Sequence, residues 1–403
     1  MHARWNYRFN VTEGVLFTSG THFISQVSVL PLFVASLTDS KFLIGLIPTL
    51  FLLGTTATQV LGAAWVAHGR DFPRTFVLAT ILPRLFQFAL IGVPLLPAEW
   101  RLPSFFLVFA GYAAVMGINF PIWTEMVSRI VPVTERGGFV GLRASLTGAT
   151  SLLTIATASW LLANLSTPWS FVACFAIAWL LGTASWGCMA MTRFPPAPAP
   201  AERPSFWRKL PGILREDANF RAYILVRILL TGGTMGTAFY IVNTLSRFGL
   251  TMGQANMLAM ALPLAQIAFG YLGGRIADRH GNKVMLVAGS VIGATALTTL
   301  LAAPTLPVYA LGLFLLGCVL HVVAGLELNF VMELGGERQA SYASIFNLAL
   351  APATFIAGLL GATLAERFGV SLVFALSAVC WGLGALALHL AVREPRQKVL
   401  SHA

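Results

Sequence analysis

The stretch Gly274-Arg275-Ile276-Ala277-Asp278-Arg279-His280-Gly281-Asn282-Lys283 lies between two long apolar runs. A degenerate copy, from Gly62 through Gly69-Arg70, stands 212 residues earlier, again between two apolar runs. Copies of one loop in the same kind of gap indicate that the chain consists of two related halves. The apolar runs on either side indicate that each loop joins two membrane-spanning helices.

The composition of the 403 residues indicates a membrane protein. Hydrophobic residues make up 57% and charged residues 10% of the chain, whereas about 25% of an average soluble domain is charged. A soluble fold could not bury so much apolar surface, but a membrane protein exposes it to lipid. The four cysteines lie in apolar runs without metal-ligand spacing. We interpret them as small core residues and expect neither a metal site nor a disulfide.

A helix needs roughly 20 apolar residues to cross the hydrocarbon core of a bilayer. The predicted spans are 10–36, 42–67, 75–96, 103–128, 138–164, 168–192, 220–246, 252–273, 284–303, 307–332, 341–365 and 370–391. The first run is too long for the apolar region of a cleavable signal peptide. We therefore expect an all-α membrane protein with twelve transmembrane helices in two pseudo-symmetric six-helix halves.

Basic residues predict the orientation of these helices, because cytoplasmic loops are enriched in lysine and arginine. With the N-terminus inside, 20 of the 26 lysines and arginines fall in cytoplasmic segments or at the adjoining helix ends. Only Lys41, Arg101, Arg247 and Arg367 fall outside. The net charge of +11 is thus a topology signal, and it does not require nucleic acid as a partner. We expect a multi-pass protein of the cell (inner) membrane with both termini cytoplasmic.

The internal repeat extends along the halves. At an offset of 213, the segment 16–21 aligns with 229–234, and Leu37-Thr38 aligns with Leu250-Thr251. Glu125 aligns with Glu327 at an offset of 202, and the drop of ten is what a longer outside loop between helices three and four would produce. Ordered matches along a whole half are evidence of duplication.

The longest polar segment divides the two halves. Its first part, 195–200, alternates proline and alanine and is typical of a stiff, extended linker. The predicted organisation is therefore an N-terminal six-helix half at 1–192, a cytoplasmic linker at 193–219 and a C-terminal six-helix half at 220–403.

The decapeptide resembles the G-x-x-x-D-R-x-G-[RKN]-[RK] loop of the major facilitator superfamily, which joins helices two and three of a six-helix half. The resemblance implies two parallel six-helix repeats with the substrate site at their interface, near the midplane. It also implies that the loop braces neighbouring helices and helps to lock one conformation. This role falls on Gly274, Asp278, Arg279, Gly281 and Lys283.

Other family patterns are missing. The first-half loop has Val66 and Ala67 where the aspartate and arginine should stand. Drug–proton antiporters of the family carry an arginine four residues before a glycine in helix four, but here Leu107 precedes Gly111. They also carry a Gly-Pro motif in helix five, and 138–164 contains no proline. The subfamily is therefore not identified.

In the superfamily, helices one, four, seven and ten surround the cavity, so polar faces of these helices are candidates for its lining. Side chains about one or two turns apart share a helix face. The predicted substrate-binding residues are His22, Gln26, Tyr112, Asn119, Trp123, Arg227, Thr231, Thr234 and His321. The alternative is that the small polar residues of these faces only allow close helix packing.

Ionisable residues within a span are costly and are usually functional. Those within the predicted helices are Glu13, Arg84, Glu125, Arg227 and Glu327. We expect Glu125 and Glu327, near helix ends, to pair with loop arginines, and Arg84 to form a structural ion pair. Arg227 is the residue best placed to meet an anionic or polar substrate.

Glu13 has no acidic counterpart in the repeat, since Val226 occupies the equivalent position. A carboxylate in a membrane span is costly when charged, which favours proton uptake. We hypothesise proton coupling through Glu13, with Arg227 as a switchable counter-charge and His22 as an alternative proton carrier. A static ion pair at the cytoplasmic edge is the competing interpretation.

These patterns together predict a proton-coupled secondary transporter that moves a small organic solute by alternating access. Export is favoured over uptake, because the cavity faces are largely apolar and aromatic. No cofactor is expected, since a G-x-x-x-x-G-K-[ST] loop is absent. The expected partners are the solute, lipid and protons, and the protein is expected to be a monomer. The alternatives are a non-transporting membrane receptor, a membrane-embedded enzyme, for which no H-E-x-x-H motif is found, and a channel.

Overall fold

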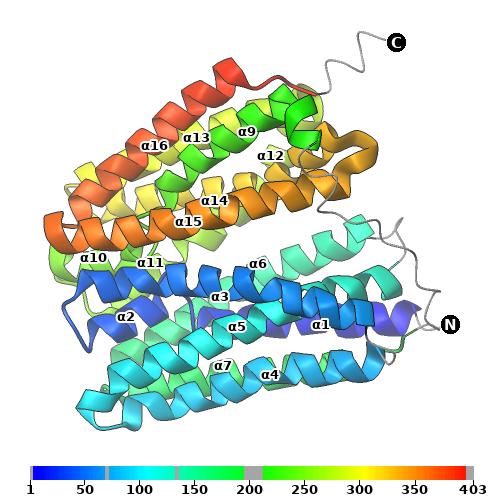
Figure 1. The fold of residues 1–403 in the computed structure, drawn as a ribbon. Coiled ribbons are helices and arrows are strands. Elements are labelled where there is room, and N and C mark those ends of the chain that lie inside the picture. Colours follow the sequence, from blue (N-terminus) through cyan, green and yellow to red (C-terminus); the bar gives the residue numbers. More distant parts are fainter. Residues whose placement is uncertain (1–2, 69–71, 132–135, 195–211, 396–403) are drawn as a thin grey trace. The chain divides into compact units, whose positions relative to one another are not determined.

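The computed structural model describes residues 3–68, 72–131, 136–194 and 212–395 (Figure 1). Every regular element in these ranges is helical, as the sequence predicts. The first half contains α1 (Ala3–His22), α2 (Val29–Ala35), α3 (Lys41–His68), α4 (Phe72–Gly92), α5 (Ala98–Ile130), α6 (Arg136–Asn164) and α7 (Trp169–Ala190). The second half contains α9 (Ala218–Thr231), α10 (Phe239–Phe248), α11 (Met252–Leu258), α12 (Ala261–His280), α13 (Asn282–Ala302), α14 (Leu306–Gly335), α15 (Gln339–Phe368) and α16 (Val370–Ala391).

Nine segments of the described chain are long and apolar enough to cross a membrane. They are α3, α4, α5, α6, α7, the α9–α10 segment, α13, α15 and α16. The other three predicted spans correspond to α1 with α2, to α11 with α12, and to α14. The multi-pass membrane character of the chain is therefore supported, while the count of twelve spans stays a prediction.

Three predicted spans contain a break in the helix. The first span is split between His22 and Val29, and the seventh between Thr231 and Phe239. The eighth is split after Leu258.

The other predicted boundaries lie within five residues of the observed helix ends, with two exceptions. The helix α1 begins seven residues before the predicted start at 10, and α12 continues to His280, seven residues past the predicted end at 273. Residues 274–280 of the motif, which the sequence predicts to be part of a loop, are therefore helical.

The chain forms two compact units. Unit 1 comprises Met1–Ala199 with Ile241–Met260, and unit 2 comprises Pro200–Tyr240 with Ala261–Ala403. The predicted division into halves at 193–219 stays a prediction, since most of that segment lies outside the described residues.

Small residues bring α3 and α5 of unit 1 together. A Cβ at Gly54 would lie 2.6 Å from the Cβ of Ala113, and a Cβ at Gly117 would collide with the backbone of Thr55. The hydroxyl of Thr58 donates a hydrogen bond across the same contact to the carbonyl of Ala114, at 2.6 Å. In a lipid environment, close contact of this kind is a main source of helix association.

Replacing Gly117 with Val is expected to destabilise unit 1, because the new side chain must push α3 away from α5. Overpacking of this type costs about 1–3 kcal/mol. The matched control is Gly187→Val on α7, where an added Cβ meets nothing within 4 Å. Thermal unfolding of the purified variants in detergent measures the difference. Equal unfolding temperatures for the two variants would contradict the assignment of a tight α3–α5 contact.

Unit 2 is held together around α13 and α16. Trp381 on α16 donates a hydrogen bond from Nε1 to the carbonyl of Gly233, at 3.0 Å, and its ring packs against Gly293 on α13. The buried hydroxyl of Tyr309 on α14 donates to the carbonyl of Tyr240, at 2.8 Å. Both bonds satisfy carbonyls close to the break in the seventh span, where regular helical bonding stops.

The segment Ile241–Met260 packs in unit 1, although it follows the linker in sequence. Asn256 on α11 is 1% exposed, and its Nδ2 donates to the hydroxyl of Ser159 on α6 at 2.9 Å. Gly253 allows this approach, since a Cβ there would lie 2.6 Å from the Ser159 carbonyl oxygen. A capping box formed by Thr251 and Gln254 fixes the start of α11.

Candidate functional site

The breaks in the first and seventh spans overlap when the two halves are aligned at the offset of 213, although the second begins about one helical turn earlier. Thr21 and Thr234 are related by the offset of 213. Each hydroxyl donates to the carbonyl three residues earlier, Thr21 to Thr18 at 2.7 Å and Thr234 to Thr231 at 2.8 Å. Interrupted helices at corresponding positions of two repeats are a typical feature of transporter binding sites.

A buried ion pair joins the first of these helices, α1, to α6. The carboxylate of Glu13 on α1 is 2% exposed and lies 2.9 Å from Nη1 of Arg143 on α6. The hydroxyl of Ser185 on α7 donates to the other carboxylate oxygen at 3.3 Å. Gly14 makes room for the pair, because a Cβ there would overlap the Arg143 guanidinium.

A second arginine of unit 1 is buried near this pair. Arg84 on α4 is 5% exposed, and its Nη1 donates to Oε1 of Gln87 at 3.0 Å. Its guanidinium lies 5.5 Å from the centroid of the Phe17 ring. The expected structural ion pair of Arg84 is not among the ion pairs of the described residues, and its Nε has no hydrogen-bond partner there.

These groups line a cavity of about 290 Å³ inside unit 1. Its lining comes from five helices, namely Glu13, Phe17 and Thr18 of α1, Thr80, Pro83 and Arg84 of α4, Met116, Asn119, Phe120 and Trp123 of α5, Arg143 of α6 and Met189 of α7. The cavity thus combines an apolar and aromatic wall with three charged side chains.

Two predicted residues of α5 belong to this cavity. Asn119 is 8% exposed, and its Nδ2 donates to the carbonyls of Ala79 and Val115 at 3.1 and 2.8 Å. The Trp123 ring lies 5.0 Å from the Arg143 guanidinium. The Asn119 Oδ1 and the Trp123 Nε1 are buried and have no hydrogen-bond partner in the described part of the chain.

The structure separates the other predicted residues of unit 1 from this cavity. Tyr112 is buried on α5 but does not line it. His22 contacts the hydroxyl of Ser151 through Nε2, at 2.7 Å. Gln26 is half-buried in the break between α1 and α2. Their role in substrate binding stays a prediction.

Arg143 is the charged residue of the cavity lining that is not among the ionisable residues predicted from the sequence to be functional. The structure shows that it forms the ion pair of Glu13. One signal was available, because Arg143 lies five residues inside the predicted span 138–164.

Unit 2 contains its own buried ion pair. Nε of Arg227 on α9 lies 2.5 Å from Oε1 of Glu327 on α14. Arg227 aligns with Gly14 in the repeat, and the Arg143 guanidinium lies beside Gly14, so each unit holds a guanidinium at this position of the repeat. It comes from α6 in unit 1 and from the equivalent helix itself in unit 2. Glu327 therefore pairs with Arg227 and not with a loop arginine.

The structure describes the side chains of two of the three remaining predicted residues of unit 2. Thr231 is buried and donates to the carbonyl of Ile228 at 2.5 Å, while Thr234 is half-buried. The side chain of His321 lies outside the described residues. Each of Glu13 and Arg227 has a partner within its own unit, and the hypothesis that they act on one another stays a prediction.

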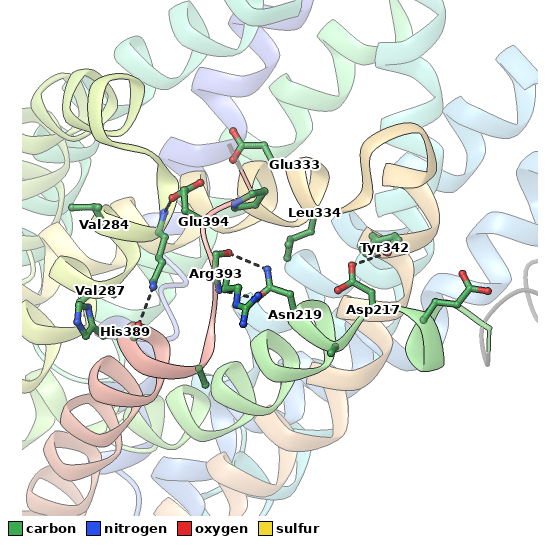
Figure 2. A pocket seen from close by; sticks show the side chains of 15 residues that line it. Asp217, Asn219, Val284, Val287, Glu333, Leu334, Tyr342, His389, Arg393 and Glu394 are labelled. Carbon is green, nitrogen blue, oxygen red and sulfur yellow. Dashed lines mark hydrogen bonds between the residues drawn. The ribbon is translucent and has the colours of Figure 1, made fainter. Parts of the chain in front are cut away.

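The decapeptide motif borders a second cavity, of about 1270 Å³, in unit 2 (Figure 2). Gly281 has a φ of +89°, which favours glycine. The backbone N–H of Lys283 donates to Oε2 of Glu394 at 2.9 Å, and its Nζ donates to the carbonyl of His389 at 2.9 Å. Asn282 donates to Oε1 of Glu333 at 2.9 Å. The start of α13 is thereby bound to the segment after α16.

For the other motif residues, no contact within the described chain supports a conformational role. Arg279 is exposed, whereas the surroundings of Gly274 and of the Asp278 side chain lie outside what the structure describes. The conformational role of these five motif residues therefore stays a prediction.

Comparison with known proteins identifies relatives of the fold. Residues 14–349 and 224–403 match the Major Facilitator Superfamily. Similar solved structures include a D-xylose–proton symporter, with 15% identity over 97% of this chain and 98% of that one and a TM-score of 0.74. A nucleoside transporter has 12% identity, coverage of 98% and 100%, and a TM-score of 0.73. The human organic anion transporter has 15% identity, coverage of 96% and 100%, and a TM-score of 0.63.

At identities this low, the structural matches establish the fold alone. No curated protein sequence matched the chain.

Proposed function

The chain belongs to the Major Facilitator Superfamily, and from this premise we propose that it is a secondary active transporter. It moves a small organic solute across the membrane by alternating access, with export favoured over uptake, as a monomer without a cofactor. The single observation that carries the proposal is the cavity of unit 1, where Glu13, Arg84 and Arg143 meet an apolar wall. Charged side chains within membrane spans are costly, and they mark substrate and ion pathways.

The test begins with a thermal-shift screen of the purified protein against a library of small organic solutes. A solute that binds the folded state raises the apparent unfolding temperature by mass action. A solute that does so is then loaded into proteoliposomes, where a transporter is expected to catalyse counterflow of the labelled compound. Binding without counterflow would favour the alternative of a non-transporting receptor, and turnover of the solute into a product would favour an enzyme.

Proton coupling through Glu13 is part of the proposal. Its carboxylate is almost fully buried and is held by Arg143 and Ser185. A proton that binds Glu13 releases Arg143 from its ion pair, so protonation changes the charge of the cavity. Transfer of the counter-charge to Arg227 as the units move remains the second step of this proposal.

The motif loop is proposed to brace one conformation of unit 2. The bonds of Lys283 to Glu394 and His389 support this role, because they join the start of α13 to the end of α16 and to the segment that follows it. Asp278 is proposed to share it, as the family resemblance implies.

We also propose that both termini are cytoplasmic and that the protein lies in the cell (inner) membrane. Cysteines introduced at Thr38 and Glu99 are expected to react with an impermeant thiol reagent added outside intact cells. Cysteines at Ala197 and Gln397 are expected to be protected. We expect this labelling pattern because most lysines and arginines fall in the segments on the same side of the membrane as the N-terminus, and such segments are usually cytoplasmic. The chain without added cysteines is the control, and labelling at Ala197 from outside would reverse the proposed topology.

A further inference from the structure

We propose that the cavity of unit 1 binds a small organic monoanion, with the anionic group at Arg84 and the apolar body against the aromatic wall. This inference rests on the proposed transport function, and it names the substrate class of that same site. It depends on the charge balance of the cavity, on the donors left without a partner, and on the chemistry of the wall.

The charges that line the cavity do not cancel. Glu13 supplies one negative charge, and Arg84 and Arg143 supply two positive charges. Arg143 forms the ion pair with Glu13 at 2.9 Å. Glu13 also interacts electrostatically with Arg84 over a longer distance, so the three side chains together keep one net positive charge, and Arg84 is the arginine without an ion pair of its own. A buried charge without a counter-ion is costly. One negative charge on a ligand would neutralise the cavity, and a neutral or cationic ligand would not.

Two hydrogen-bond donors of the cavity lining have no partner in the described chain. Arg84 uses Nη1 for Gln87, but its buried Nε has no partner in the described chain. The indole Nε1 of Trp123 is likewise buried without a partner there. Asn119 does not compete for the anion, since its Nδ2 already donates to two carbonyls. A planar carboxylate suits a guanidinium edge, because charge-assisted bonds to arginine are short and directional.

The rest of the wall sets the size and polarity of the ligand. Phe17, Pro83, Met116, Phe120 and Met189 present carbon and sulfur to the cavity. The volume of about 290 Å³ lies just below the roughly 300–1,000 Å³ typical of ligand pockets. A monocarboxylate with a single ring or a short aliphatic body matches both properties. A bare inorganic anion would leave the apolar wall without a contact.

The test is equilibrium binding by isothermal titration calorimetry, with purified full-length protein in detergent and with three probes. Benzoate carries the charge and the ring, benzamide carries the ring without the charge, and inorganic phosphate carries charge without a ring. Benzoate is expected to bind, and the dissociation constants of benzamide and phosphate are expected to be at least about tenfold higher. Equal binding of benzamide, or phosphate binding as tight as that of benzoate, would overturn the proposal.

Variants locate the site. Arg84→Met is expected to weaken benzoate binding at least about tenfold, and Trp123→Phe, which removes one donor and keeps a ring, several-fold. Glu13→Gln is expected to tighten it, since this change deletes the negative charge of the lining. Arg101→Met is the matched control, because Arg101 lies in the same unit and outside the cavity, donating to the Leu96 carbonyl.

The ligand-free unfolding temperature of each variant separates lost binding from lost folding. Equal losses of benzoate binding in Arg84→Met and Arg101→Met, or weaker binding in Glu13→Gln, would contradict the assignment. The two proposals fail separately in these experiments. If the protein catalyses counterflow of a neutral solute but does not bind benzoate, the anion site is refuted and the transport function is not. Benzoate binding at Arg84 without counterflow of any solute would refute transport and leave the anion site intact.

Discussion

Replacing Glu13 with Gln is expected to abolish the accumulation of solute that is driven by a pH gradient. The amide keeps the size of the side chain and can still meet Ser185, but it cannot take up a proton. With one proton per solute, one pH unit corresponds to about 1.4 kcal/mol and supports at most about tenfold accumulation. In Glu13→Gln proteoliposomes, we expect this ratio to fall to about one, while counterflow without a gradient is retained.

The matched control for this experiment is Glu125→Gln. Glu125 is also an acid within a predicted span, but it pairs with Arg129 of the same helix at 3.0 Å and does not line the cavity. We expect this variant to accumulate solute as the wild type does. Undiminished gradient-driven accumulation by Glu13→Gln would mean that another group carries the coupling proton.

The second large effect is expected in unit 2, at the Arg227–Glu327 pair. Arg227→Met leaves the Glu327 carboxylate without its partner in a mostly buried position, with side-chain exposures of 9% and 15% for the pair. Removing one member of such a pair costs about 3–5 kcal/mol, whereas replacing both with apolar residues is often neutral or stabilising. The double variant Arg227→Met/Glu327→Leu is therefore expected to regain most of the stability lost by Arg227→Met.

An exposed pair in the same unit supplies the control. Arg338 and Glu216 lie 3.2 Å apart, but their side chains are 63% and 67% exposed. Solvent-exposed pairs contribute about 0–1 kcal/mol, so Arg338→Met should hardly change the unfolding temperature measured in detergent. If Arg338→Met and Arg227→Met lowered it equally, burial would not be what makes the Arg227 pair matter.

Most helix boundaries could be predicted from the sequence to within five residues, because hydropathy over about 20 residues is a strong local signal. The start of α1 and the end of α12 could not, because charged and polar residues lower the hydropathy there. The breaks at 23–28 and 232–238 could not be predicted either, although the first segment contains two serines and the second contains three glycines and two threonines. A span remains apolar on average when one turn of it unwinds. Only the hydrogen bonds that replace the helical ones, such as that of Trp381 to Gly233, decide whether an unwound turn is stable.

The candidate site was predictable where helical periodicity carries the information. Asn119 and Trp123 lie one turn apart on α5, and both line the cavity. The pairing of Glu13 with Arg143 was not predictable, because it joins two helices whose contact the sequence does not specify. Gly14 is an example. Its lack of a side chain matters only because the Arg143 guanidinium of α6 lies against it, and the sequence does not show that contact.

The position of α11 also determines when, during synthesis of the chain, unit 1 can be completed. Asn256 follows Ser159 by 97 residues along the chain, yet the two are hydrogen-bonded within unit 1. During translation, α6 enters the membrane well before the segment that covers its Ser159 face has left the ribosome. The first unit is therefore completed only by a late-synthesised part of the chain. A fragment that ends at the linker lacks that part and therefore cannot form the hydrogen bond between Asn256 and Ser159.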